Sequence, residues 1–417
     1  STDFQYEKHP VATYLITATQ TGYVRDRDMA YHRRSHPPVT LTYHRPQLHE
    51  TIQTIDGSSL ENLPIGLDGN AYQWVDLNGE GISGILTQQS AGWFYKDNLG
   101  AATFASMRQV SPRPSVADLA SSQQRLVDLA GDGHQDLLVL SPGLNGFYER
   151  GLKQDWANFK SFQSLPKVDW RDPNLKWIDL TGDGRADLLI SEQEVFVWYP
   201  SEAEAGFGES AMVRKLRNEE QGPALVFADG EQSVYLADMT GDGLNDIVRT
   251  RNGAVCYWPN LGYARFGAKV TMGQAPTFDH PELFQQGRIR LADIDGSGTT
   301  DIIYLGRDTV SLWFNQSGNA WSMPQRLSQF PPVDDVAAVQ VVDLLGHGTA
   351  CLVWSSPLPG DRPHHMQYID LMGGQKPHLL RQIPLPAHSC SIMTTWGDTT
   401  QDGHLIGMRN LDWNQDT

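Results

Sequence analysis

One pattern recurs six times in this sequence and constrains the fold more than any other feature. An apolar pair leads into an aspartate, a D-x-x-G-x-G loop follows, and a second apolar run ends each copy. Clear copies are WVDLNGEGISGIL (74–86), WIDLTGDGRADLL (177–189) and LADIDGSGTTDII (291–303). The leading aspartates are Asp76, Asp128, Asp179, Asp238, Asp293 and Asp343, with separations of 52, 51, 59, 55 and 50 residues. Such regular spacing predicts one structural unit for each copy.

The residues around each loop predict β-structure. A short polar turn follows each apolar run, and in five copies an aromatic cluster comes next: Trp93–Tyr95, Phe147–Tyr148, Trp198–Tyr199, Tyr257–Trp258 and Trp313–Phe314. Aromatic and β-branched residues bounded by Gly, Asn, Pro and Ser are typical of short antiparallel strands. About fifty residues for each unit fits one four-stranded blade. The sequence therefore predicts an all-β fold, a β-propeller of six blades, with seven blades as the alternative.

The repeats leave residues 1–73 and 354–417 to be placed on either side of the repeat region 74–353. Strands are predicted at 14–19 and 39–43, and two more at 390–396 and 404–408. Because an open sheet edge invites pairing with other chains, we expect strands from both termini to close the ring. This assigns residues 1–417 to one propeller domain. We interpret the chain, which starts without Met, as a fragment of a larger polypeptide.

Composition narrows the classes of partner. The net charge of −17 disfavours nucleic acid, whose phosphates need a basic surface, and it equally disfavours direct insertion into an anionic membrane. It permits a basic partner. Cys256, Cys351 and Cys390 are too widely spaced for a zinc knuckle or a disulfide framework, and we expect isolated core thiols.

The aspartate loops have two interpretations. Their spacing resembles the first half of a calcium loop, which places oxygen ligands at positions 1, 3, 5 and 9. Only the fifth copy supplies an oxygen at all four positions: Asp293, Asp295, Ser297 and Asp301. Other copies have Ala130, Thr181 or Thr240 at position 3, and the first has Gly84 at position 9. The favoured interpretation is a turn that its own aspartate holds by hydrogen bonds, and no cofactor or metal is predicted.

No catalytic motif is present. The sequence contains no G-x-S-x-G, H-E-x-x-H or G-x-x-x-x-G-K-[ST] pattern, so we expect the chain not to be an enzyme. The aromatic clusters could line sugar pockets, which makes a carbohydrate-binding, lectin-like propeller the alternative function. Packing between blades is the favoured role for these rings, because each blade buries both of its faces.

The repeat resembles the FG-GAP and VCBS propeller families between Trp74 and about Val353. Three segments together give a narrower resemblance: YLITATQTGYVRD (14–26), PPVTLTYHRP (37–46) and YQWVDLNGEGISGILTQQSAGWFYKDNLG (72–100). They resemble the B component of the tripartite insecticidal Tc toxins, in a region related to bacterial SpvB-type virulence proteins. This resemblance spans most of the chain and brings no family catalytic residues with it.

The resemblance implies a specific role. In that family the B and C components form a shell around an unfolded effector enzyme, and the B propeller closes one end. It docks on the pore-forming A component and opens to let the effector pass. We therefore expect a non-catalytic docking and gatekeeper module of a secreted bacterial toxin. Its expected partners are the A component and the C component with its effector.

Two hypotheses about the gate follow from the sequence. The sixth copy is degraded, with Leu345, His347 and Cys351 in its loop, and an expanded turn, 355–368, follows it. We expect this region to be the less stable part of the ring and to exchange amide hydrogens faster than the second and third copies. An acidic channel that favours a cationic effector is the second hypothesis.

Overall fold

Each repeat forms an antiparallel sheet in the computed structural model. The structure describes residues 1–417 except 10, 12, 26, 45–46, 65–71, 90–91, 112, 115–117, 120–122, 142, 152–154, 232, 308, 329–338, 356–365, 374–377, 383–390, 398–402 and 411–417. The all-β prediction is confirmed, because the described residues contain no α-helix and only two 3₁₀ turns, Ala203–Ala205 and Gln286–Arg288. Nowhere in the described chain is there a helix long and apolar enough to cross a membrane.

Five sheets of four strands each begin with the strand that precedes a D-x-x-G-x-G loop. The first sheet contains β6 (Tyr72–Val75), β7 (Gly84–Gln89), β8 (Gly92–Lys96) and β9 (Arg108–Gln109), and the second contains β10 (Gln124–Val127), β11 (Asp136–Ser141), β12 (Leu144–Tyr148) and β13 (Lys160–Ser161). The third contains β14 (Leu175–Ile178), β15 (Asp187–Ser191), β16 (Val195–Tyr199) and β17 (Ala211–Arg214), and the fourth contains β18 (Val234–Ala237), β19 (Asp246–Arg251), β20 (Ala254–Trp258) and β21 (Val270–Thr271). The fifth contains β22 (Ile289–Ala292), β23 (Asp301–Leu305), β24 (Val310–Trp313) and β27 (Gln325–Leu327); β25 (Asn315–Gln316) and β26 (Ala320–Trp321) form a separate hairpin beside it.

The sixth sheet takes its fourth strand from an earlier part of the chain. It contains β28 (Val339–Val342), β29 (Cys351–Ser355), β30 (Met366–Asp370) and β5 (Gln53–Thr54). The Ile55 N–H donates to the Met366 carbonyl oxygen at 3.1 Å, and the Tyr368 hydroxyl donates to Gln53 Oε1 at 2.7 Å. Strands from both terminal segments therefore pair in this sheet, as expected, because β5 lies in residues 1–73 and β30 in residues 354–417. The strands predicted at 14–19, 39–43, 390–396 and 404–408 take no part in it.

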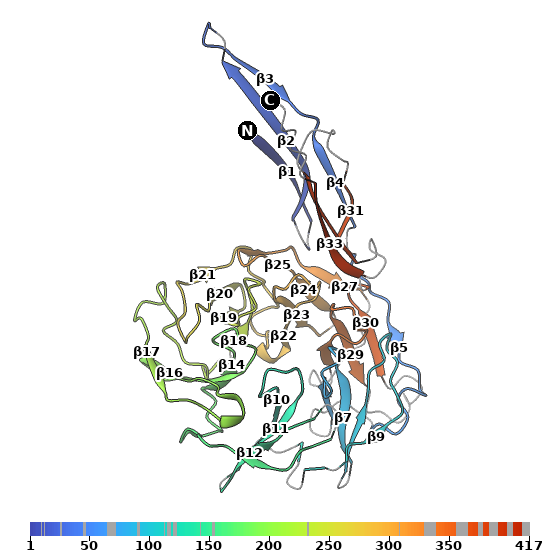
Figure 1. The fold of residues 1–417 in the computed structure, drawn as a ribbon, viewed down its shortest axis with the longest axis vertical. Coiled ribbons are helices and arrows are strands. Elements are labelled where there is room, and N and C mark those ends of the chain that lie inside the picture. Colours follow the sequence, from blue (N-terminus) through green and yellow to red (C-terminus); the bar gives the residue numbers. More distant parts are fainter. Residues whose placement is uncertain are drawn as a thin grey trace. The chain divides into compact units, whose positions relative to one another are not determined.

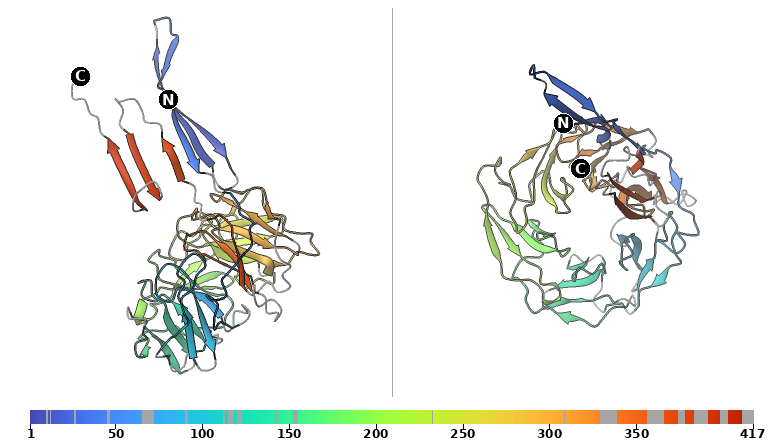
Figure 2. Two further views of the ribbon diagram at one scale, coloured as in Figure 1. Left: turned by 90° about the vertical axis from the view of Figure 1, so that its right-hand side faces the viewer. Right: turned by 45° about the horizontal axis from the view of Figure 1, so that its top comes forward.

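The six sheets contact one another in cyclic order. Neighbouring pairs are joined by Arg150 Nη2 to Asn78 Oδ1 (2.9 Å), the Arg125 guanidinium over the Trp177 ring (5.3 Å), the Tyr263 N–H to the Leu180 oxygen (2.8 Å), Asn315 Nδ2 to the Met239 oxygen (3.0 Å) and the Ala350 N–H to the Ile294 oxygen (3.2 Å). Asn98 Nδ2 donates to the Leu344 oxygen at 3.0 Å and so joins the first sheet to the sixth. Figure 2 shows these sheets following one another around a common centre. In Figure 1, β10, β14, β18 and β22 lie nearest that centre.

The core lies between neighbouring sheets. One cluster joins Leu86, Trp93 and Tyr95 of the first sheet to Leu137 and Tyr148 of the second, and similar clusters join other neighbouring sheets. The predicted aromatic residues are largely core residues, as favoured: Trp93, Phe147, Tyr257, Trp258 and Trp313 are all buried. Cys256 and Cys351 are buried free thiols, and Cys390 falls outside the described residues.

Contacts divide the chain into two compact units, whereas the sequence predicted one domain over residues 1–417. One unit is 48–374, which holds the six sheets, and the other combines 1–47 with 375–417. In the second unit β1 (Thr2–Lys8), β2 (Thr13–Arg25), β4 (Val39–His44) and β31 (His378–Gln382) form a sheet in which β3 (Tyr31–Ser35) also pairs with β2, and β32 (Ser391–Gly397) pairs with β33 (Gly403–Asn410). The four strands predicted in these two segments are therefore present.

Candidate functional site

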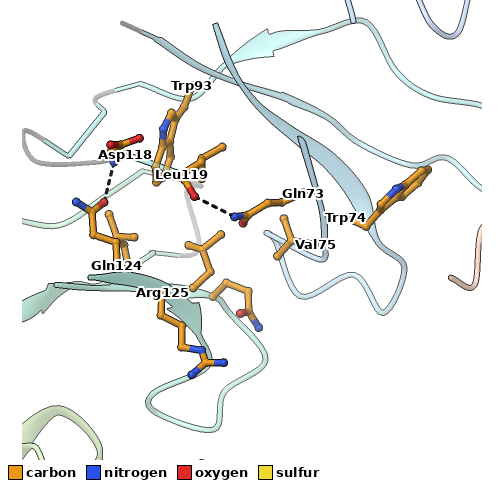
Figure 3. Close-up of a pocket in the computed structure, with 11 residues that line it drawn as sticks. Gln73, Trp74, Val75, Trp93, Asp118, Leu119, Gln124 and Arg125 are labelled. Atoms are coloured by element: carbon orange, nitrogen blue, oxygen red, sulfur yellow. Dashed lines mark hydrogen bonds between the residues drawn. The ribbon is translucent and has the colours of Figure 1, made fainter. Parts of the chain in front are cut away.

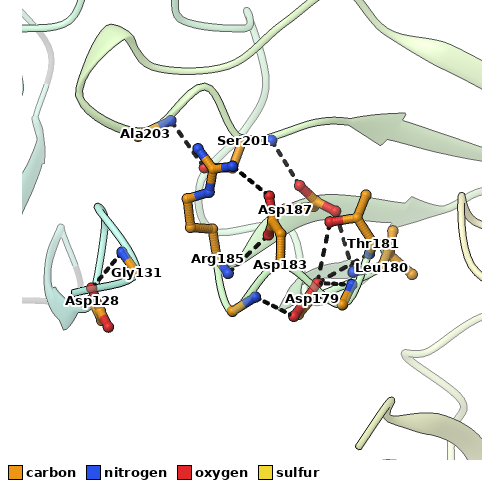
Figure 4. A network of polar contacts seen from close by, with 12 residues as sticks. Asp128, Gly131, Asp179, Leu180, Thr181, Asp183, Arg185, Asp187, Ser201 and Ala203 are labelled. Carbon is orange, nitrogen blue, oxygen red and sulfur yellow. Dashed lines mark hydrogen bonds and ion pairs between the residues drawn. The ribbon is translucent and has the colours of Figure 1, made fainter. Parts of the chain in front are cut away.

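The leading aspartate of every repeat holds its own loop closed. In all six copies one carboxylate oxygen, Oδ2, accepts the N–H of the second loop glycine at 2.6–2.9 Å. The other oxygen accepts an N–H one or two residues earlier, as Asp128 does from Gly131 at 2.7 Å (Figure 4). Both glycines of each loop have φ between 70° and 88°, a region that side chains with a Cβ rarely adopt. These bonds are those of the favoured interpretation, a turn held by its own aspartate.

The ninth loop residue ties the loop to the sheet. Asp187, Asp246 and Asp301 each accept two backbone N–H groups, one inside the loop and one just after the third strand of the sheet. For Asp246 the donors are Met239 at 2.9 Å and Asn260 at 2.8 Å. The ninth-position aspartates are 0–3% exposed. Since a buried N–H without an acceptor is costly, this carboxylate has a structural role in the copies that carry it.

Two copies lack the ninth carboxylate and replace it in different ways. In the first copy the Tyr95 hydroxyl takes its place: it accepts the Leu77 N–H at 3.3 Å and donates to the Val75 oxygen at 3.0 Å. Gly84 leaves room for this hydroxyl, because a Cβ there would lie 2.3 Å from Tyr95 Oη. In the sixth copy Cys351 occupies the position, and burial raises the pKa of its thiol to about 12.

The fifth loop gathers the three carboxylates singled out for calcium. Oxygens of Asp293, Asp295 and Asp301 lie within 4.8 Å of one another. Desolvation, with the Asp293 carboxylate nearby, raises the pKa of Asp295 to about 6. Ser297 lies in the same loop, where its hydroxyl is 2.9 Å from Thr299 Oγ1. Asp293 accepts the same backbone donors as its equivalents in loops without a third carboxylate, so the shape of this loop does not require a cation.

Two cavities lie at the second sheet. The larger, about 500 Å³, is lined by β6 and β10 and includes Gln73, Trp93, Gln124 and Arg125 (Figure 3). The smaller, about 300 Å³, is lined by Gln124, Arg125, Trp170 and Trp177, where β10 meets the third sheet. Arg125 lines both cavities. It was not among the residues singled out from the sequence, although a polar residue at the second position of each repeat's first strand was a readable signal.

The chain is similar to several solved structures of Tc toxin assemblies. Neither a family model nor a curated protein matches it. A chain in the Photorhabdus luminescens Tc holotoxin pore is 28% identical, with a TM-score of 0.73, and the match covers 92% of this chain and 17% of that one. A TcdB2–TccC3 structure is 27% identical, with a TM-score of 0.57, over 92% of this chain and 18% of that chain. The TcdB2–TccC3–Cdc42 structure is 26% identical, also with a TM-score of 0.57, over 94% and 18%.

These matches support a resemblance of this chain to the B component of Tc toxins. The chain spans less than a fifth of the length of the chains it matches. The resemblance to FG-GAP and VCBS repeats stays a prediction.

Proposed function

We propose that residues 48–374 form a six-bladed β-propeller that serves as the docking and gatekeeper module of a Tc toxin B component. Each sheet would be one blade, with β5 closing the ring. The observation that carries the proposal is the match to the Tc holotoxin pore, at a TM-score of 0.73 over 92% of the chain. The cyclic contacts of the six sheets support the architecture.

In this proposal the propeller does no catalysis. It binds the pore-forming A component, and an effector enzyme carried unfolded by the C component passes through it after docking. The setting is a bacterial toxin secreted from the cell. Net charge −17 and the fit to toxin assemblies support a protein partner rather than nucleic acid.

Binding to the A component is the direct test. We expect the purified chain to bind an immobilised Tc toxin A component tightly and saturably, as measured by surface plasmon resonance. A glycan array serves as the control. Sugar signals on the array without binding to the A component would replace this proposal with the lectin-like alternative.

The structure weakens that alternative. Sugar-binding aromatic rings must be open to solvent so that a pyranose can stack on them. Trp93 and Trp258 are 0% exposed, and Phe147 is 1% exposed. These rings pack against neighbouring sheets instead.

The gate is proposed to lie at the sixth sheet. The expanded turn 355–368 falls largely outside the described residues, but Ser355 at its start and 366–368 at its end are described. β5 pairs with β30 through only two residues, Thr54 with Gln367 and Gln53 with Tyr368. The outer strands β9, β13 and β21 also pair through only two residues, but β5 differs from them because it comes from a distant part of the chain. We infer that this pairing can open without disturbing the other sheets.

Hydrogen exchange tests this location. We expect the Ile55 amide, which donates to the Met366 oxygen, to exchange faster than the Val213 amide in β17, where four residue pairs join β16 and β17. Mass spectrometry of peptides covering 53–56 and 211–214 gives the comparison. If the two peptides are equally protected from hydrogen exchange, the proposal that the gate lies at the sixth sheet is wrong.

A further inference from the structure

The first strand of each sheet carries no negative charge. These strands, β6, β10, β14, β18, β22 and β28, have four residues each and contain no Asp or Glu, in a chain whose net charge is −17. We call them the inner strands, because β10, β14, β18 and β22 lie nearest the common centre in Figure 1. The second residue of each strand is polar: Gln73, Arg125, Lys176, Tyr235, Arg290 and Gln340. We call these six residues the inner set. Three of them are Lys or Arg, so the six strands together carry a net positive charge, and a loop aspartate directly follows each strand.

Strand register places the inner set at the junctions between sheets. Arg125 pairs with Leu138, Lys176 with Leu189 and Arg290 with Ile303, and paired residues share a face of the sheet. Leu138 packs against Trp177 of the next sheet, so Arg125 lies on the face toward that sheet. The same register holds for Gln73, Tyr235 and Gln340, which pair with Leu86, Val248 and Val353. Each junction therefore has one polar side chain at its inner edge.

Arg125 is an accessible cation in a hollow of the protein. It is exposed and lines both cavities described above, while nearby protein atoms lower its pKa by desolvation. Among the described residues its one specific contact is the Trp177 ring, at 5.3 Å. The carboxylate in the larger cavity, Asp118, accepts a hydrogen bond from Gln88 Nε2 at 3.3 Å. The guanidinium thus keeps its donors for a ligand.

The other two cations of the inner set have different surroundings. Lys176 is half-buried and makes no ion pair with any residue that the structure describes. Arg290 donates to backbone oxygens, with Nη1 2.7 Å from the Gly287 oxygen. Its contribution to ligand binding is therefore its positive charge rather than its hydrogen-bond donors. Gln73 and Gln124 border the cavity beside Arg125, where Gln73 Nε2 donates to the Leu119 oxygen at 3.5 Å and Gln124 Oε1 accepts the Asp118 N–H at 2.7 Å (Figure 3). The positive charges and hydrogen-bond donors of Arg125 and Lys176 suit a ligand whose carboxylates are carried on an extended polypeptide.

We propose that the inner set binds an acidic segment of an extended polypeptide, whose carboxylates bond to Arg125 and Lys176. This deepens the proposed function, because a polypeptide that passes the propeller would meet this edge, and it is the alternative to the hypothesis of an acidic channel. Each inner strand is followed directly by a loop aspartate, Asp128 after β10 and Asp179 after β14. These carboxylates repel a dense polyanion such as nucleic acid more than a chain with scattered carboxylates.

Peptide binding tests the proposal. Fluorescence anisotropy measures the affinity of the whole 417-residue chain for an unstructured peptide of alternating Glu and Gly, at low salt. We expect Arg125→Gln to weaken binding roughly tenfold and Arg125→Gln with Lys176→Gln roughly a hundredfold, because charge-assisted hydrogen bonds are lost. Arg326→Gln, the same change at an exposed residue of the outer strand β27, is the matched control and should change affinity less than about twofold. Thermal unfolding checks that each variant is folded.

The controls decide between the possible ligands. An alternating Lys and Gly peptide that binds equally well would overturn the proposal, as would a poly-dT oligonucleotide that binds more tightly than the acidic peptide. Equal weakening by Arg326→Gln would also overturn it. The assay contains no A component, so it stands apart from the docking test. If the chain docks on the A component but does not bind the acidic peptide, the proposal for the inner set is wrong and the docking role stands. If the chain binds the peptide but does not dock, only the proposal for the inner set stands.

Discussion

Replacing Gly84 by Ala is expected to lower the free energy of unfolding by about 3 kcal/mol or more, because the added methyl group has no space. Its Cβ would lie 2.3 Å from Tyr95 Oη and 2.6 Å from the backbone oxygen of Lys96. Tyr95 is fully buried and cannot swing into solvent, and Lys96 O belongs to a strand paired with β7. Either Tyr95 gives up its bonds to Val75 and Leu77, or the β7–β8 pairing shifts.

Chemical denaturation of the Gly84→Ala and Gly57→Ala variants measures this effect. A methyl group added to Gly57 would meet no atom within 4 Å, so Gly57→Ala should change the unfolding free energy by less than about 1 kcal/mol. Tyr95→Phe, which removes only the hydroxyl, should cost about 1–3 kcal/mol through the unsatisfied Leu77 N–H. Equal stability of the two alanine variants would show that the Tyr95 hydroxyl does not occupy the space beside Gly84.

Gly84 and Tyr95 also show which part of the structure could be predicted from the sequence and which part could not. The six loops were predictable because every leading aspartate and both glycines stand at fixed positions. Gly84 looked like a lost ninth carboxylate, and nothing in its own loop indicated a replacement. Tyr95 fills the role from the following strand, and only the register of β7 with β8 brings the two together.

The strand that completes the sixth sheet could not be located from the sequence. Strands from both terminal segments were expected to pair, and β5 is one of them, but Gln53 and Thr54 form a two-residue strand with no periodic pattern. What fixes this strand is burial of Ile55 and Leu60 against Met366 and Tyr368. Such a contact between distant segments leaves no local signal in the sequence.

The candidate site was predictable in part. Asp293, Asp295 and Asp301 were singled out by spacing, and the structure brings their oxygens together. Arg125 was missed because a lone cation on a short strand resembles an ordinary surface residue. Its importance comes from the two cavities it lines, which exist only once neighbouring sheets pack.

The ninth-position carboxylates lead to the second large effect. Asp246→Ala is expected to lower the free energy of unfolding by about 2–5 kcal/mol at neutral pH, since the Met239 and Asn260 N–H groups lose their shared acceptor in the protein interior. The matched control is Asp242→Ala, four residues earlier in the same loop. Asp242 is exposed, and its carboxylate accepts the Leu244 N–H at 2.9 Å, so this change should cost less than about 1 kcal/mol.

The cost of Asp246→Ala should also depend on pH. Desolvation raises the pKa of Asp246 from 3.8 to about 6 in the folded protein, so the folded state holds this proton more tightly than the unfolded state does. The contribution of Asp246 to stability is therefore full below about pH 4 and falls as pH rises toward 6. Denaturation at pH 5 and pH 7.5 should show the substitution costing about 1 kcal/mol more at pH 5. A larger cost at pH 7.5 than at pH 5 would contradict this. It would mean that the hydrogen bonds from the two backbone N–H groups lower the pKa of Asp246 more than desolvation raises it.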